Sequence, residues 1–441
     1  MARWDDMAAR GPVGPGELTG AYLVLLDADA VGEGVRALEN GTGLSMASAS
    51  DLADAAAGRH ALDEADAIVF AELGCAVVQP APDQVEGLRT ASRSAPAILA
   101  MEPERVVHAI EQHPHSPVTL DYLRGYRDGI AHLVDGLGVG AAPAGAAAAD
   151  GAPWPDESEA TWGLQAVHAV ESCLSGTGVR VAVLDTGFDA AHPDYADRVV
   201  QMESFVDGES AQDEHGHGTH CIGSACGSLR TQVLPRYGVA HGAEIYAGKV
   251  LSNRGGGADR GILAGMDWAL RTRCRVVSMS LGAPTEPEQA FSQVYEAVAR
   301  RSLRAGTVIV AAAGNDSRRE SGTVRPVSHP ANCPSIMAVG AVDRNLAVAP
   351  FSNSGVNPNG GQVDVAAPGV DVHSSIPGAS YDRWNGTSMA TPHVAGVLAL
   401  LAESDPDATG AELAARVTTT ARRLPLASAD VGAGLVQAPR R

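Results

Sequence analysis

The chain has 441 residues, 45% hydrophobic and 19% charged, which suits a globular enzyme of two or three domains. Its 32 basic and 52 acidic side chains give a net charge of −20, which argues against nucleic acid or an anionic membrane as partner. No apolar run reaches the roughly 18 residues of a membrane span. The N-terminus lacks the basic start and apolar core of a signal peptide, so we expect a cytoplasmic protein or one exported by a signal outside this sequence. Six irregularly spaced cysteines do not form a disulfide scaffold. Buried free thiols are expected, with one or two disulfides as the alternative if the protein is exported.

The first predicted unit, residues 19–110, is a small α+β domain. Strands are expected at Ala21–Leu26, within Ala67–Gln79 and again from Ala97. Helical patterns separate them, in an Ala/Asp-rich stretch and at Asp83–Ala91. The order strand, helix, two strands, helix, strand predicts a ferredoxin-like arrangement, with helices on one face of an antiparallel sheet.

A connecting segment, 111–160, follows. Residues 116–137 carry leucines and an isoleucine on one helical stripe. Residues 138–155 are small and punctuated by Gly and Pro, which is typical of a linker.

From residue 161 to 441, strand and helix patterns alternate, which predicts an α/β domain with a mostly parallel sheet flanked by helices. Ligands of such sheets gather at the carboxyl ends of the strands, where Asp185, Gly282 and Asn315 fall. The expected strands are Val179–Gly187, Ala243–Leu251, Cys274–Gly282, Gly306–Asn315 and Ser335–Val342, and the expected helices are Gly261–Thr272 and Gln289–Gly306.

Two motifs early in this domain carry catalytic residue types. "DTG" at Asp185 ends a buried strand. Aspartic proteases use this triplet twice, but it occurs once here, and alone it fits a turn-capping Asp equally well. "EHGHGTHCIG" places His215, His217, His220 and Cys221 together, yet no second ligand pair is spaced for zinc. A histidine base at a helix start is the favoured interpretation.

Two later motifs supply an amide and a hydroxyl. "AAAGN" places Asn315 directly after a strand, as a turn residue or as a donor to a developing oxyanion. In "GTSMATPHVAG", Ser388 heads a helix whose free N–H groups favour negative charge. A serine needs an adjacent base to become a nucleophile. His217 can be that base, and Asp185 can hold the histidine in the correct tautomer. His393 is interpreted as a packing residue.

The order Asp, His, Asn, Ser decides between these readings. The span from about Trp162 to Ala438 resembles the subtilisin-like serine proteases through "VAVLDTGFDAAHPD", "HGHGTHCIG", "KVLSNRGGGA", "SMSLG", "AAAGN" and "NGTSMATPHVAGVLALL". Cys221 after "HGTH" and "YGVAHGAEIYAGKVL" look closer to the proteinase K branch.

The resemblance implies a serine endopeptidase that needs no cofactor for its chemistry and acts on protein or peptide substrates. Asp185, His217 and Ser388 would form the triad, with Asn315 as oxyanion donor. Two segments would pair with the substrate backbone on either side. A pocket without a clear Asp or Glu would accept medium or large apolar residues. The implied substrate-binding residues are Gly255, Gly256, Gly257, Ser280, Leu281, Gly282, Ala313 and Gly314.

By the same resemblance, residues 19–110 would be an inhibitory propeptide that assists folding and then blocks the site until cut. About 50 residues separate its last strand from Trp162, and the linker, within 138–160, is the favoured cut site. A structural calcium would use the carbonyl groups of Pro334 and Ile336 with Asp343, although Asp343 fits a turn role equally well.

Two competing functions remain. A catalytically silent, protease-like binding module is disfavoured because every triad and oxyanion residue is present. A sedolisin-like acid peptidase shares a "GTS" serine motif but uses Glu and Asp in place of His, which "HGHGTH" contradicts.

Overall fold

The computed structural model describes residues 17–49, 66–110, 154 and 156–440. The helix expected at 116–137 and nearly all of the expected linker lie outside these residues. Within the described part of the chain, each helix is too short or too polar to cross a membrane. All six cysteines are free thiols, five of them buried.

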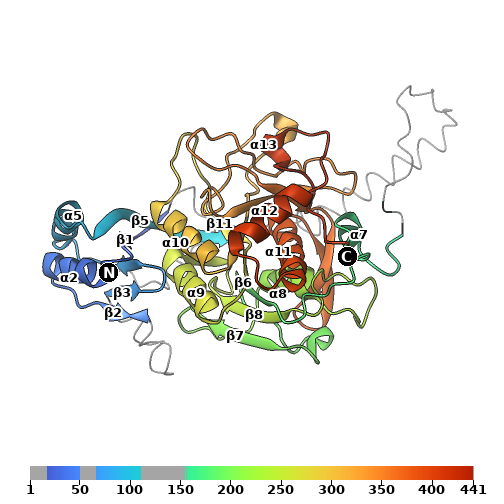
Figure 1. The fold of residues 1–441 in the computed structure, drawn as a ribbon, viewed down its shortest axis with the longest axis horizontal. Coiled ribbons are helices and arrows are strands. Elements are labelled where there is room, and N and C mark those ends of the chain that lie inside the picture. The colour runs from blue at the N-terminus through green and yellow to red at the C-terminus, as the bar shows by residue number, and fades with distance from the viewer. Residues whose placement is uncertain (1–16, 50–65, 111–153, 155, 441) are drawn as a thin grey trace.

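The larger domain is built on a parallel sheet, as predicted (Figure 1). Its strand order is β14-β13-β12-β10-β6-β8-β7, and every neighbouring pair is parallel. All five expected strands contribute to it, whereas β7 and β14 were not anticipated. The bounds are β6 (Arg180–Asp185), β7 (Val200–Ser204), β8 (Glu244–Lys249), β10 (Val276–Met279), β12 (Val308–Ala312), β13 (Met337–Val342) and β14 (Val365–Pro368).

Helices cover both faces of this sheet, so its strands are apolar on both sides. Val181 and Val183 of β6 face the core shared with α8 (His217–Cys226) and α11 (Thr387–Ser404). Ala182 and Leu184 face the core shared with α9 (Asp259–Arg271) and α10 (Gln293–Arg304). The remaining elements are α7 (Trp162–Ala166), α12 (Gly410–Thr420), α13 (Ser428–Val431), two 3₁₀ turns (Pro193–Tyr195, Arg319–Ser321) and the hairpin of β15 (Val372–Ile376) and β16 (Ser380–Trp384).

The described residues of the N-terminal domain have the predicted strand and helix order with one addition, a short strand at Ala47–Ser48 after the first helix. The stretch Ala67–Gln79 is a hairpin, because Gly74 turns the chain with φ +59°. The sheet order is β5-β1-β4-β3-β2, and helices α2 and α5 pack on one face. The bounds are β1 (Leu18–Leu26), α2 (Val31–Thr42), β2 (Ala47–Ser48), β3 (Ala67–Phe70), β4 (Cys75–Val78), α5 (Val85–Ser94) and β5 (Ile98–Ala109).

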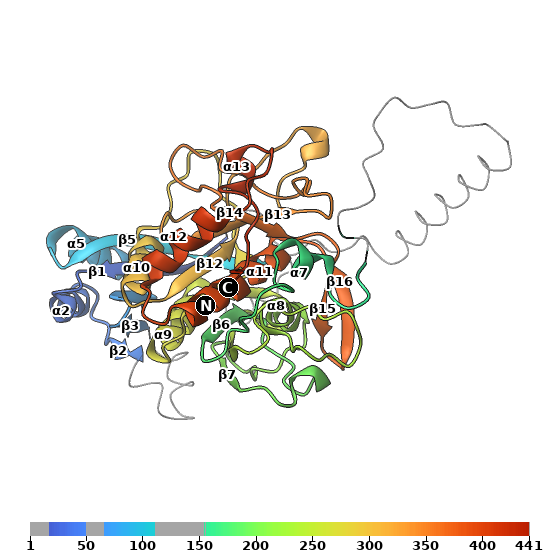
Figure 2. The same ribbon diagram turned by 45° about the vertical axis from the view of Figure 1, so that its right-hand side comes forward.

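The second face of this small sheet is also apolar. In β1, Val24 and Leu26 lie in the core under α2 and α5, whereas Leu23 and Leu25 lie in a core shared with α9 and α10. The larger domain therefore supplies the cover for this face, and the two domains lie side by side in both views (Figures 1 and 2).

Strand β5 joins the two domains directly. Its C-terminal half inserts between β9 (Gly256–Ala258) and β11 (Leu281–Gly282) of the larger domain and pairs antiparallel with both. Ile110 follows β5 immediately, so the chain is led to the carboxyl edge of the parallel sheet, where the candidate site lies.

Candidate active site

Three of the predicted residues meet at the ends of regular elements. Asp185 is the last residue of β6, His217 the first of α8, and Ser388 the second of α11. All three side chains are buried. Gly386 precedes α11 with φ +155°, and a Cβ there would come within 3.0 Å of Asn315 Nδ2. The serine therefore sits at a helix start that only glycine can precede without strain.

Asp185 and His217 form a direct pair. The Nδ1 atom of His217 lies 2.7 Å from Oδ1 of Asp185, which also accepts the Thr186 N–H at 2.7 Å. Burial lowers the pKa of His217, but the neighbouring Asp185 carboxylate outweighs it, and the pKa lies well above the ordinary imidazole value. The other ring nitrogen, Nε2, makes no hydrogen bond within the described residues.

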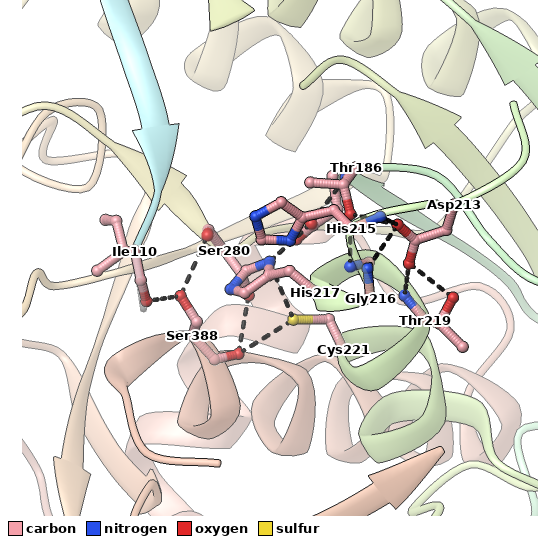
Figure 3. Close-up of polar contacts among 12 residues, drawn as sticks. Ile110, Thr186, Asp213, His215, Gly216, His217, Thr219, Cys221, Ser280 and Ser388 are labelled. Atoms are coloured by element: carbon pink, nitrogen blue, oxygen red, sulfur yellow. Dashed lines mark hydrogen bonds and ion pairs between the residues drawn. The ribbon is translucent and has the colours of Figure 1, made fainter. Parts of the chain in front are cut away.

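The hydroxyl of Ser388 is directed at the chain that follows β5 (Figure 3). It hydrogen-bonds the carbonyl oxygen of Ile110, and that of Ser280 at 3.1 Å. Within the described residues, neither Ser388 Oγ nor His217 Nε2 is bonded to the other, because the Ser388 hydroxyl contacts these two carbonyl oxygens.

Asn315 binds the same carbonyl oxygen. Its Nδ2 donates to Ile110 O at 3.0 Å, while its Oδ1 accepts the N–H and the hydroxyl of Thr387 at 2.9 and 2.8 Å. The amide is thus fixed with its N–H₂ group toward the carbonyl, the orientation that an oxyanion donor needs.

A model of the subtilase family matches residues 176–434. This chain belongs to the subtilase family. It is 40% identical over 252 residues to subtilisin E of Bacillus subtilis, covering 57% of this chain and 62% of that protein. The chain is also 40% identical over 252 residues to the subtilisin of Bacillus pumilus, and this span covers 86% of that protein. It is 40% identical over 282 residues to subtilisin BL of Lederbergia lenta, a span that covers 96% of that protein and 63% of this chain. The chain thus spans less than two thirds of subtilisin E.

The two segments expected to bind substrate in this subtilase hold the end of β5. His108 pairs with Gly256 on one side and with Gly282 on the other. The Ala109 N–H donates to Gly255 O at 2.9 Å, and the Ile110 N–H donates to Ser280 O at 3.2 Å. Gly257 and Leu281 complete the pairing, opposite Val107 and Ala109.

The carbonyl group of Ile110 lies between Ser388 and Asn315, and its side chain lies against Gly282. A Cβ on Gly282 would meet Cδ1 of Ile110 at 2.8 Å, so this glycine makes room for an apolar side chain. Ala313 and Gly314 lie behind Asn315, and their backbone groups bond to Val339, Ser328, Asn353 and Thr387. A separate cavity of about 1070 Å³ opens beside Asn315, with Glu286 and Asp316 on its wall; the residues expected to wall the specificity pocket do not line it.

His220, one of the residues weighed for a zinc site, has partners of its own away from Asp185. Nε2 of His220 lies 3.0 Å from Val372 O, its ring stacks on Trp384, and burial lowers its pKa to about 3. Within the described residues, the group spaced for a metal is Asp185, His217 and Cys221, with ligand atoms within 4.8 Å of one another. A metal there would compete with the bond between Asp185 and His217.

Two further predictions concern single side chains. Asp343 Oδ1 accepts the N–H groups of Asn345 and Ala347 at 2.8 and 2.9 Å, which is the arrangement of a turn residue. His393 is buried, with Nδ1 2.8 Å from Met389 O, and burial lowers its pKa to about 4. His393 is thus a buried residue of α11 that hydrogen-bonds its own helix.

Sequence reasoning missed three residues of the site. Trp384 stacks near His217, Thr387 orients Asn315, and Asp213 joins the segments that carry Asp185 and His217. Asp213 lies four residues before His217, and this short spacing is the feature of the sequence that could have indicated its place in the site.

Proposed function

We propose that this subtilase is a serine endopeptidase made as a self-maturing zymogen. One observation carries the proposal: the Ile110 carbonyl oxygen accepts from Asn315 and lies against Ser388, beside the pair of His217 and Asp185. A backbone carbonyl held between an oxyanion donor and a nucleophile is in position for acyl transfer.

The reaction follows from these positions. Ser388 Oγ attacks the Ile110 carbonyl carbon while His217 Nε2 takes its proton. Asn315 Nδ2 and the free N–H groups at the start of α11 stabilise the oxyanion. The bond to Glu111 breaks, its amine takes the proton from His217, and an acyl-enzyme on Ser388 remains. Water, deprotonated by His217, then attacks the Ile110 carbonyl carbon; the bond to Ser388 Oγ breaks, Oγ takes the proton back from His217, and the Ile110 carboxylate is released. No cofactor enters these steps.

The N-terminal domain fits the role of an inhibitor that stays bound after the cut. Glu104 accepts the Arg260 N–H at the start of α9 at 2.8 Å, and Glu102 accepts the Gln293 N–H at the start of α10 at 2.5 Å. Side-chain oxygens at helix N-termini accept N–H groups that have no partner within the helix. These contacts hold the domain without the covalent link at Ile110.

In the other direction, Arg301 of α10 reaches into the N-terminal domain. Its guanidinium donates to the carbonyl oxygen of Leu73, and to that of Leu26 at 3.2 Å. A Cβ on Gly74 would collide with the guanidinium, so the turn leaves room for it. The domain is thus held at a second point, at the end of β1 and the turn between β3 and β4, away from the C-terminal end of β5.

Labelling with a fluorophosphonate tests the catalytic part of the proposal. We expect Ser388 to be labelled, peptide hydrolysis to peak at neutral pH or above because His217 must lose its proton, and both signals to vanish in Ser388→Ala. Failure of the wild-type chain to label or to hydrolyse peptides would favour the silent binding module. Activity peaking in acid would favour a sedolisin-like mechanism.

A further inference from the structure

A second buried carboxylate lies beside the pair of Asp185 and His217. Asp213 precedes α8 and is 1% exposed. Its Oδ1 accepts the hydroxyl of Thr186 at 2.9 Å and the N–H groups of His215 and Gly216 at 3.0 and 2.9 Å. Its Oδ2 accepts the N–H and the hydroxyl of Thr219 at 2.9 and 2.7 Å.

These five donors outweigh the cost of burial. Burial raises the pKa of Asp213, but the N–H of Gly216 and both donors of Thr219 bond the charged form, and the pKa lies below its ordinary value. Asp213 is therefore ionised at neutral pH, with both oxygens used in binding its own chain.

The donors come from the two segments that present Asp185 and His217 (Figure 3). Thr186 follows Asp185 directly, and its hydroxyl oxygen also accepts the Gly218 N–H at 2.8 Å. Gly216 and Thr219 belong to the first turn of α8, around His217. The backbones approach so closely that a Cβ on Gly218 would lie 2.2 Å from Gly187 O.

We propose that Asp213 is a positioning residue for catalysis, which fixes the start of α8 against the end of β6 and thereby the bond between His217 and Asp185. This proposal rests on the protease function proposed above. Asp213 acts through Thr186 and the first turn of α8, not on the substrate. A helix-capping role alone would require only the donors at the start of α8. The hydrogen bond from Thr186 also links Asp213 to the end of β6.

The variant Asp213→Asn tests the proposal, because an amide N–H₂ group must then face two or three donors. Displacements of about 1 Å at a catalytic group cost up to about 10²-fold. We expect kcat for peptide hydrolysis by the matured chain to fall by roughly 10- to 100-fold, with KM within about threefold. Because contact with Asp185 raises the pKa of His217, loosening that contact moves the acid limb of the pH profile to lower pH.

Asp194→Asn is the matched control. Asp194 is also buried and accepts from Gln232 N at 2.8 Å, Tyr237 OH at 2.6 Å and Tyr381 OH at 3.1 Å, away from the triad. We expect it to lower Tm comparably but to leave kcat and the pH profile unchanged.

Two outcomes would overturn the proposal. The first is a folded Asp213→Asn protein with the kcat and pH profile of Asp194→Asn. If Asp213→Asn does not fold, Thr186→Val decides, because it removes only the hydroxyl bridging Asp213 and Gly218; kcat equal to wild type would then refute the proposal, and a five- to tenfold fall would support it. Failure of the protease function is distinguishable, since the wild-type chain itself would then not hydrolyse peptides.

Discussion

The two sheets of this subtilase are covered in different ways. The parallel sheet of the larger domain is covered on both faces by its own helices, whereas the N-terminal sheet has its own helices on one face only. Its second face, which includes Leu23, Leu25 and Phe70, is buried against α9 and α10. An apolar sheet face left in water is unfavourable. The N-terminal sheet is therefore complete only against the larger domain, and the surface that covers it also directs β5 into the candidate active site.

The largest expected effect concerns the larger domain, whose sheet is covered on both faces by its own helices. Asn315→Ala removes the amide that binds the Ile110 carbonyl. We expect kcat for a peptide substrate to fall by roughly 10²–10³-fold with little change in KM, the loss known for an oxyanion donor in a subtilisin. Asn345→Ala, which alters an exposed amide, is the control and should match wild type. A kcat for Asn315→Ala within about threefold of wild type would remove this residue from the mechanism.

The next effect concerns the contact between the N-terminal domain and helix α10 of the larger domain. Arg301→Ala removes the hydrogen bonds from a charged group to the carbonyl oxygens of Leu26 and Leu73. We expect the cleaved N-terminal fragment to inhibit about 10- to 100-fold less tightly and the lag before activity to shorten. Arg300→Ala is the neighbouring control, since Arg300 is exposed and pairs with Glu296. Equal inhibition of both variants would show that Arg301 does not hold the domain.

A smaller effect should appear with pH. Burial in the interface raises the pKa of Glu104 from 4.5 to about 7, although Arg260 and Thr19 oppose the shift. The complex therefore binds an extra proton, so this contribution to binding is complete below about pH 4.5 and is lost as pH rises through about 7. We expect roughly tenfold weaker inhibition at pH 8.5 than at pH 5.5.

Glu104→Gln checks the origin of that pH dependence. The amide cannot titrate, so the inhibition constant of the fragment should change much less between the two pH values. Wild-type inhibition that is constant over this range, or a Glu104→Gln protein with the full wild-type dependence, would contradict the assignment to Glu104.

Much of the fold and site was predictable because the relevant signals are local. Short apolar runs ending in Asp185 or just before Asn315 indicate buried parallel strands, and Ser388 follows a glycine at a helix start. Each of these residues lies in a short motif whose neighbouring residues can be recognised from the sequence alone. Two signals indicated that these residues meet. Parallel strands share one carboxyl edge, and the family resemblance assigned the residues to one site.

What was missed depends on contacts between distant segments. The register of β5 against β9 and β11 places the Ile110 carbonyl group against Ser388, which the sequence alone does not show. The expected cut within 138–160 stays a prediction. Asp213 looks like an ordinary loop acid until its donors from two other segments are assembled. Two consecutive strands were expected within Ala67–Gln79, but the turn at Gly74 between them was not located, because both strands are apolar on both faces.

Intact mass spectrometry of the full chain, followed over time, tests the central claim most directly. The account predicts that the first products of the wild-type chain are a fragment ending at Ile110 and a remainder beginning at Glu111, and that Ser388→Ala stays uncut. Later trimming within 138–160 is compatible with this order. A first cut within 138–160 without one after Ile110, cleavage in Ser388→Ala, or an uncut wild-type chain with full activity would contradict it.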